Sequence, residues 1–321
     1  MSVRLIATGG TIASLADPET GAVRPAVSAE DLVRSVPGLG DVEVEVEQVA
    51  HVNGWNVTPS TMLEVARRAA GGGDVVVTHG TDTIEETAFF CDVTVEGDVV
   101  FAGAMRNGSE VSADGPRNLL CASQVAAAPR GLGTVLVLND EIHAARWARK
   151  QDSSRVSAFT SPGHGPVGIA VPGSVRITAP PPQRVVLPLP DALPPVAVIQ
   201  TYTGIEEGLI SAVLEATGAQ GLVLEGTGLG NVPGSAERGI RDALARGLPV
   251  VAATRVPTGG TGAVYGGPGG GVTLRELGVL AAGPLSAAKA RLLLMLLVAA
   301  GADVGPRFDE AIATLSGWEA P

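Results

Sequence analysis

The sequence predicts an α/β protein with two domains, and three observations support this prediction. Short apolar runs rich in β-branched residues recur along the 321-residue chain, and each ends in glycine or polar residues. Segments with helical spacing lie between these runs, and alternating strands and helices are typical of α/β architecture. A proline-rich segment then divides the chain into two parts, each of ordinary domain size.

The expected strands are apolar on both faces, which suits a sheet covered by helices on both sides. They span residues 3–7, 75–78, 99–102, 134–138, 196–200, 221–224 and 248–253. Helical patterns are predicted at 59–70, 84–90, 205–217, 235–246 and 286–300, and at the run HAARWARK, residues 143–150. The first of these helices has Thr58 as its predicted N-cap and Pro59 at the first helical position.

Seven prolines between residues 180 and 195 cannot continue a helix or a central strand. We therefore expect a larger N-terminal α/β domain over 1–179, a linker over 180–195, and a smaller C-terminal α/β domain with a parallel sheet over 196–321.

Composition excludes several classes of protein. The chain has 22 basic and 33 acidic residues, a net charge of −11, and no basic block, which argues against binding to a nucleic-acid backbone. Hydrophobic residues make up 45% and charged residues 17%, so the chain can bury a core and disorder is not expected. Cys91 and Cys121 lie in apolar surroundings without CxxC spacing and are expected to be buried free thiols.

Targeting, membrane and cofactor signals are weak. The N-terminus MSVRLIATGG has too short an apolar core for a signal peptide, so we expect a cytoplasmic protein. The most apolar stretch, 292–300, is well below the roughly 20 residues that span a bilayer and predicts a buried helix. The four histidines are scattered without HExxH spacing, and GTGLG at 226–230 does not fit the dinucleotide fingerprint, so no metal or cofactor is expected.

Two threonine-rich motifs follow predicted strands. TGGTIA, residues 8–13, follows the first strand, and HGTDT, residues 79–83, follows the second. Paired glycines let the backbone approach a ligand closely, and α/β sheets place ligand sites at the carboxyl ends of their strands. The alternative is structural: TGG can be a tight turn, and Thr81, Asp82 and Thr83 can be helix N-caps.

Together with later segments, these motifs resemble the bacterial-type L-asparaginase and glutaminase family. The further segments are GAMR at 103–106, SADGP at 112–116, ND at 139–140 and RVPTG at 255–259. The resemblance covers nearly the whole chain. It implies a threonine amidohydrolase that converts a small-molecule substrate, asparagine, to aspartate and ammonia. It also implies a homodimer or homotetramer whose sites form between the N-terminal domain of one chain and the C-terminal domain of another.

The resemblance assigns catalytic roles to four residues. Thr11 matches the nucleophile that forms an acyl-enzyme, and Thr81, Asp82 and Lys150 match the family's Thr-Asp-Lys group. A threonine hydroxyl is a poor nucleophile without a base, and a lysine can be that base only when burial and neighbours lower its pKa. From the residues alone, Lys150 at the end of the helical run 143–150 could also be a solvated cation. Asp82 is expected to pair with the substrate's α-ammonium group and to be solvated by water without it.

Other positions are expected to bind the substrate. Trp55 stands where the family usually offers a serine to the substrate carboxylate. One alternative is that Trp55 simply packs and leaves Gly54 N–H and Asn56 to bind the carboxylate, and the other is that it reshapes the pocket for a different amide. N–H groups near Thr81 and Ala104 are candidates for stabilising the oxyanion. Asn231 matches an asparagine that relatives present across a subunit interface, although it could equally be a turn residue.

The sequence also departs from the family. The loop 14–28 lacks the tyrosine that activates the nucleophile in relatives, and the chain has only two tyrosines, Tyr202 and Tyr265. Tyr265 lies in segment 259–271, where eight of thirteen residues are glycine. Our hypothesis is that Tyr265, or a residue such as Arg24, replaces the missing tyrosine. A weakened paralogue acting as an amino-acid-binding sensor is the alternative function.

Overall fold

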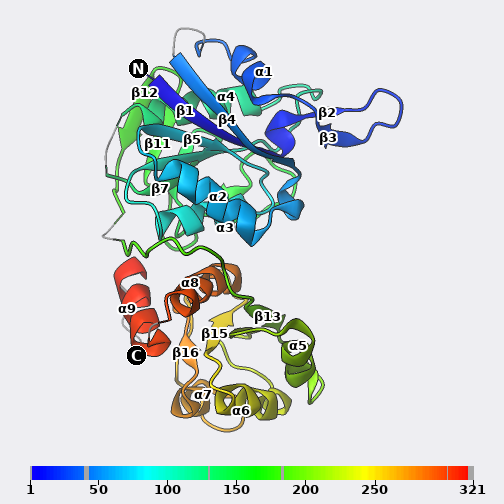
Figure 1. Cartoon of the computed structure of the whole chain (residues 1–321), viewed down its shortest axis with the longest axis vertical. Helices are drawn as coiled ribbons and strands as arrows, with labels where there is room; N and C mark the ends of the chain where they lie inside the picture. Colours follow the sequence, from blue (N-terminus) through cyan, green and yellow to red (C-terminus); the bar gives the residue numbers. More distant parts are fainter. Residues whose placement is uncertain (1, 40–42, 129–130, 182–183, 302, 317–321) are drawn as a thin grey trace. The chain divides into compact units, whose positions relative to one another are not determined.

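The computed structural model describes residues 2–39, 43–128, 131–181, 184–301 and 303–316 (Figure 1). The chain divides into two units, Met1–Pro181 and Pro182–Pro321. The predicted linker 180–195 spans this boundary, and its residues 182 and 183 lie outside the described residues. Its role as a linker stays a prediction.

An eight-stranded mixed sheet forms the first unit, in the order β12-β11-β8-β7-β6-β5-β1-β4. Five neighbouring strands are parallel: β4 (Glu43–Val52), β1 (Ser2–Gly9), β5 (Asp74–Thr78), β6 (Val99–Ala102) and β7 (Thr134–Leu138). Three antiparallel strands complete it: β8 (Glu141–Ala144), β11 (Gly168–Val171) and β12 (Ser174–Ile177). The predicted strands of this unit are confirmed, and their parallel pairing brings several carboxyl ends to one edge.

Helices cover both faces of this sheet (Figure 1). α1 (Ala29–Arg34) and α4 (Gly115–Ala126) pack on the face that presents Val3, Leu5, Val76 and Val100. α2 (Pro59–Ala69) and α3 (Ile84–Asp92) pack against each other on the opposite face. The Thr58 hydroxyl accepts a hydrogen bond from the N–H of Thr61 at 3.3 Å, which confirms the predicted N-cap.

The prediction of a helix at residues 143–150 is wrong. Residues Asn139 and Asp140 adopt positive φ angles of 50° and 66°, and the chain reverses there so that β8 pairs antiparallel with β7. The guanidinium of Arg146 then reaches the buried carboxylate of Asp92 at 3.0 Å. Lys150 lies in the two-residue strand β9 (Arg149–Lys150), which pairs with β10 (Phe159–Thr160). Strand pairing and a buried ion pair therefore override the local helical spacing.

The second unit has a parallel four-stranded sheet in the order β13-β14-β15-β16, which confirms the predicted parallel sheet. Its strands are β13 (Ala197–Gln200), β14 (Leu222–Gly226), β15 (Val250–Thr254) and β16 (Leu280–Ala281). Figure 1 shows helices on both faces: α5 (Leu209–Thr217), α6 (Glu237–Ala245), α7 (Gly271–Leu277), α8 (Ala287–Ala299) and α9 (Val304–Ser316). α5 begins four residues later than predicted, after Gly208 with a φ of 95°.

Both cysteines are buried and free, as predicted. The apolar stretch at 292–300 lies largely in α8, whose leucines are buried. Within the described ranges, no helix has the length and apolar character needed to cross a membrane.

Candidate active site

Three glycines bring three loops into backbone contact at the carboxyl edge of the first sheet. A Cβ atom placed on Gly10 would fall on the backbone of Gly80, closer than real Cβ contacts allow. A Cβ atom on Gly80 would lie 2.6 Å from the Cα atom of Gly54. The motifs TGGTIA and HGTDT, together with the segment around Trp55, therefore meet only because these positions lack side chains.

Thr11 is positioned by this contact and by the end of β1. It begins the 3₁₀ turn η1 (Thr11–Ala13), directly after Gly10 with a φ of 80° and a ψ of −175°. The N–H of Gly10 donates to the carbonyl of Val52 at 2.9 Å, which fixes the turn against β4. Thr11 itself is half-buried. Its hydroxyl is thus held on a short rigid turn at the sheet edge.

Thr81, Asp82 and Lys150 converge, as the family resemblance implied, and their catalytic roles stay a prediction. The Lys150 ammonium donates to the Thr81 hydroxyl at 3.0 Å and to Asp82 Oδ1 at 2.7 Å. Thr81 is buried, the Lys150 side chain is 18% exposed and the Asp82 side chain is 45% exposed. Asp82, expected to be solvated by water when no substrate is bound, also has Lys150 as a cationic partner.

Glu85 fixes the backbone of Lys150, a contact that sequence analysis missed. The N–H of Lys150 donates to Glu85 Oε2 at 2.6 Å, from the first turn of α3. Lys150 also pairs with Phe159 across β9 and β10. The signal lay in the sequence as an acidic residue four positions after Thr81, but it reads there only as a favourable charge near a helix N-terminus.

His79 is a fully buried neutral residue at the base of the HGTDT loop. Its Nδ1 lies 2.8 Å from the carbonyl of Gly80, and its Nε2 lies 2.8 Å from the hydroxyl of Thr87. A carbonyl can only accept, so Nδ1 carries the proton and Nε2 accepts from Thr87. Burial lowers the pKa of His79 to about 4, and the Gly80 hydrogen bond offsets only part of this effect. His79 therefore clamps the loop rather than titrating near neutral pH.

The loop after β6 is held by two side chains from the SADGP region. Asp114 Oδ2 and Oδ1 accept the N–H groups of Met105 and Arg106 at 3.0 and 2.8 Å. Asn118 donates to the carbonyl of Gly103 at 2.9 Å. Ala104, the candidate oxyanion position, is fully buried between these contacts. Asp114 and Asn118 thus give the quoted motif a structural reason.

The segment expected to bind the substrate carboxylate forms the 3₁₀ turn η2 (Gly54–Asn56). The Thr83 hydroxyl donates to the carbonyl of Gly54 at 2.7 Å, which ties this turn to the HGTDT loop. Gly54 is buried, Asn56 is exposed and Trp55 is 66% exposed. Trp55 therefore does not pack into the interior of the first unit.

The loop that lacks a tyrosine forms a hairpin of β2 (Ser14–Ala16) and β3 (Val23–Pro25), visible in Figure 1 as an extension from the first unit. The N–H of Gly108 donates to the carbonyl of Ser14 at 3.0 Å, and the N–H of Ala16 donates to the Ser109 hydroxyl at 3.0 Å. Arg24 pairs with Leu15 in the hairpin and is exposed. The base of the hairpin is therefore anchored beside Thr11.

Asn231 and Tyr265 belong to the second unit. Asn231 Oδ1 accepts the N–H of Gly271 at 3.0 Å, and its carbonyl accepts the N–H of Thr227 at 2.8 Å. Tyr265 is 59% exposed, and its carbonyl accepts the N–H of Val272 at 2.9 Å. A part for either residue in a site with Thr11 stays a prediction.

Two family models match this chain, one over each of its two units. Residues 2–183 match the family described as Asparaginase, N-terminal, and residues 195–305 match the Glutaminase/Asparaginase C-terminal domain. This chain belongs to the asparaginase family. The resemblance inferred from the motifs is thereby confirmed.

Relatives of this asparaginase-family chain match it along most of its length. A probable L-asparaginase of Deinococcus radiodurans is 39% identical over 317 residues, which cover 93% of each chain. L-asparaginase 2 of Bacillus subtilis is 37% identical over 314 residues, 92% of this chain and 82% of that protein. The crystal structure of a probable cytoplasmic L-asparaginase from Campylobacter jejuni superposes with a TM-score of 0.87 at 31% identity, covering 98% of this chain and 99% of that one.

Replacing Gly80 with alanine is expected to destabilise the first unit by about 2 kcal/mol, because the new methyl group would overlap the backbone of Gly54. Urea unfolding followed by circular dichroism measures this loss. The matched control is Gly97→Ala, since a Cβ atom there would meet nothing within 4 Å. Equal stability of the two variants would contradict the proposed backbone contact.

Acidification is expected to destabilise the protein through His79. The folded-state pKa of His79 is about 4 and the ordinary value is 6.5, so the unfolded chain binds a proton first as pH falls. Between pH 7 and pH 5 this residue should lower the free energy of unfolding by about 2 kcal/mol. Urea titrations at both pH values measure this loss. Between pH 7 and pH 5 the free energy of unfolding should fall by about 2 kcal/mol less for His79→Asn than for wild type. For His51→Asn, a change at an exposed position, it should fall as much as for wild type.

Proposed function

We propose that this protein is an L-asparaginase that hydrolyses the side-chain amide of asparagine to aspartate and ammonia through an acyl-enzyme on Thr11. The observation that carries the proposal is the contact of Lys150 with Thr81 and Asp82 at the sheet edge where Thr11 begins its turn. Membership of this chain in the asparaginase family also supports the proposal.

In the first step, Thr11 Oγ attacks the amide carbon of the substrate while its proton passes to a base. The tetrahedral intermediate then collapses, the carbon–nitrogen bond breaks, and the nitrogen takes a proton and leaves as ammonia. An ester between Thr11 and the aspartyl group remains. Splitting one difficult hydrolysis into two easier displacements is the advantage of a covalent intermediate.

In the second step, water attacks the ester carbonyl and releases aspartate and the Thr11 hydroxyl. Thr81 is suited to orient or deprotonate this water, because its hydroxyl lies 3.0 Å from Lys150 Nζ. Through this contact, Thr81 and Lys150 would act together in moving the proton that the water gives up. Asp82, half-exposed and already bound to Lys150 through Oδ1, offers Oδ2 to the α-ammonium of the substrate.

Oxyanion stabilisation is assigned to backbone N–H groups of the loop after β6 and of the Thr81 turn. The N–H groups of Met105 and Arg106 are already bound by Asp114. The proposal therefore leaves the N–H of Ala104 as the donor from this loop. Such a donor typically contributes about 3 kcal/mol to transition-state stabilisation.

Substrate recognition is assigned to Gly54 and Asn56 for the carboxylate, with Trp55 beside them, and to Asn231 from a second subunit. The supporting observation is the hydrogen bond from the Thr83 hydroxyl to the Gly54 carbonyl, which ties this turn to the HGTDT loop that carries Asp82. Because Asn231 matches an asparagine that relatives present across a subunit interface, we propose a homodimer or homotetramer, to be tested by light scattering on the purified protein. A cytoplasmic location is also proposed, because the similar Campylobacter jejuni protein is described as a probable cytoplasmic L-asparaginase.

The second candidate is hydrolysis of a different small amide, and a further alternative is a weakened paralogue that binds an amino acid as a sensor. Trp55, 66% exposed where relatives offer serine, is the observation that favours it. Ammonia release from asparagine, glutamine and a panel of small amides separates the two candidates. Saturable binding without turnover on any of them would support the sensor.

Thr11→Ala and Thr81→Val are each expected to lower kcat/KM for asparagine by at least about a thousandfold, because each removes a reacting hydroxyl. Ammonia release gives the rate, and circular dichroism checks the fold. Thr217→Val, on the exposed end of α5, is the matched control and should keep full activity. Substantial turnover by either site variant would refute its role.

Tyr265→Phe is expected to lower kcat at least about tenfold, because the hypothesis makes its hydroxyl the group that activates Thr11. The matched control is Tyr202→Phe, which removes the only other tyrosine hydroxyl of the chain, one bound to Glu206 at 2.7 Å. Equal rates for both variants would exclude Tyr265 and move the test to Arg24→Gln.

A further inference from the structure

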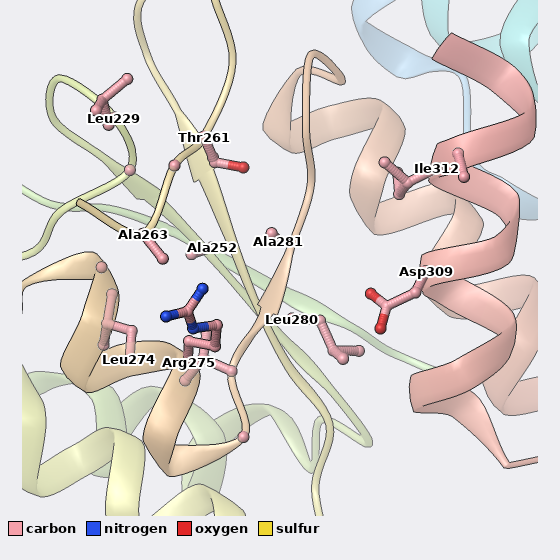
Figure 2. A pocket seen from close by; sticks show the side chains of 16 residues that line it. Leu229, Ala252, Thr261, Ala263, Leu274, Arg275, Leu280, Ala281, Asp309 and Ile312 are labelled. Carbon is pink, nitrogen blue, oxygen red and sulfur yellow. The ribbon is translucent and has the colours of Figure 1, made fainter. Parts of the chain in front are cut away.

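The second unit contains a cavity of about 560 Å³ that the proposed reaction does not use. It lies at β16, the edge strand of the four-stranded sheet, between α7, α9 and the glycine-rich segment 259–271 (Figure 2). This volume falls in the range of small-molecule sites in proteins. No part of the threonine motifs lines it.

Most of the cavity wall is apolar. Its larger side chains come from four different elements or loops: Leu229, Leu274, Leu280 and Ile312. Alanines and glycines line much of the remainder, including Ala252 in the middle of β15 and Ala313 on α9. Such a wall favours a ligand with an apolar body, because burial of apolar surface supplies most of the binding energy.

Two opposite charges border this apolar space. Figure 2 shows Arg275 of α7 and Asp309 of α9 approaching from two sides of β16, with Leu280 between them. Neither side chain has a hydrogen-bond or ion-pair partner among the residues that the structure describes. Partial burial of the carboxyl group raises the pKa of Asp309. Both residues are exposed, so the site offers one guanidinium and one carboxylate that are unpaired among the residues the structure describes.

We propose that this cavity binds a small zwitterion whose carboxylate and ammonium groups are separated by an apolar body, such as a dipeptide of aliphatic residues. The carboxylate would pair with Arg275, the ammonium with Asp309, and the aliphatic side chains would cover Leu274, Leu280 and Ile312. A guanidinium suits a carboxylate because it can donate two parallel hydrogen bonds. Because Figure 2 shows Leu280 between Arg275 and Asp309, we expect a ligand with well-separated charges to reach both residues more readily than an α-amino acid.

The cavity shares no lining residue with the proposed active site, although segment 259–271, which carries Tyr265, borders it. Its test does not require activity. Leucyl-leucine is titrated into the purified protein in a calorimeter, with excess aspartate present to occupy the proposed active site. Saturable binding is expected, with weaker binding of leucine. Caproate and hexylamine, which each carry one charge, should bind at least about tenfold more weakly than ε-aminocaproate, which carries both.

Variants locate the ligand. Arg275→Gln and Asp309→Asn should each weaken leucyl-leucine binding at least about tenfold. Arg246→Gln, an exposed arginine outside the cavity, and Glu310→Gln, the neighbour of Asp309 on α9, are the matched controls and should bind as wild type does. Ala313→Trp should abolish binding of every probe by filling the space.

Two results would overturn the proposal. One is the absence of saturable binding by the wild-type protein at the highest soluble concentration of leucyl-leucine. The other is binding that neither charge-removing variant weakens. In that second case Arg275 would serve only to favour the C-terminal end of α7, as basic residues in a last turn do.

Discussion

The candidate active site depends on one constraint, the backbone contact of Gly10, Gly80 and Gly54. The three loops lie far apart in the sequence but follow the neighbouring strands β1, β4 and β5. Their backbones can meet only where no Cβ atom intervenes. Thr11 follows the first of these glycines, Thr81 follows the second and Trp55 follows the third. The spacing of the reacting groups is therefore set by main-chain van der Waals contact, which is stiffer than contact between side chains.

Satisfied polar groups then hold these loops in place. His79 bonds Gly80 and Thr87, Asp114 binds two consecutive N–H groups, and Glu85 fixes the backbone of Lys150. None of these three residues is assigned a reacting role. Each restricts the motion of a loop that carries a residue with a proposed reacting role. Such restriction keeps catalytic groups close to productive geometry before the substrate arrives.

The charged side chains at the candidate sites of the two units differ in whether they have partners. In the first, the charged groups at the sheet edge already have partners, such as Lys150 with Asp82. In the second, Arg275 and Asp309 border an apolar cavity without partners among the described residues. A paired cluster suits repeated proton transfer, whereas separated unpaired charges suit recognition of a ligand that brings its own countercharges.

Sequence reasoning alone was sufficient for the fold class, the central strands, the parallel second sheet and the family, because apolar runs and glycine-threonine motifs are local signals. It also predicted that Thr81, Asp82 and Lys150 belong together. It failed at residues 143–150, where helical spacing is real but antiparallel pairing with β7 and the buried pair of Arg146 with Asp92 decide the conformation. Only the tertiary structure could decide which glycines touch, how Lys150 is held and where free charges border a cavity, since those contacts join residues that are distant along the chain.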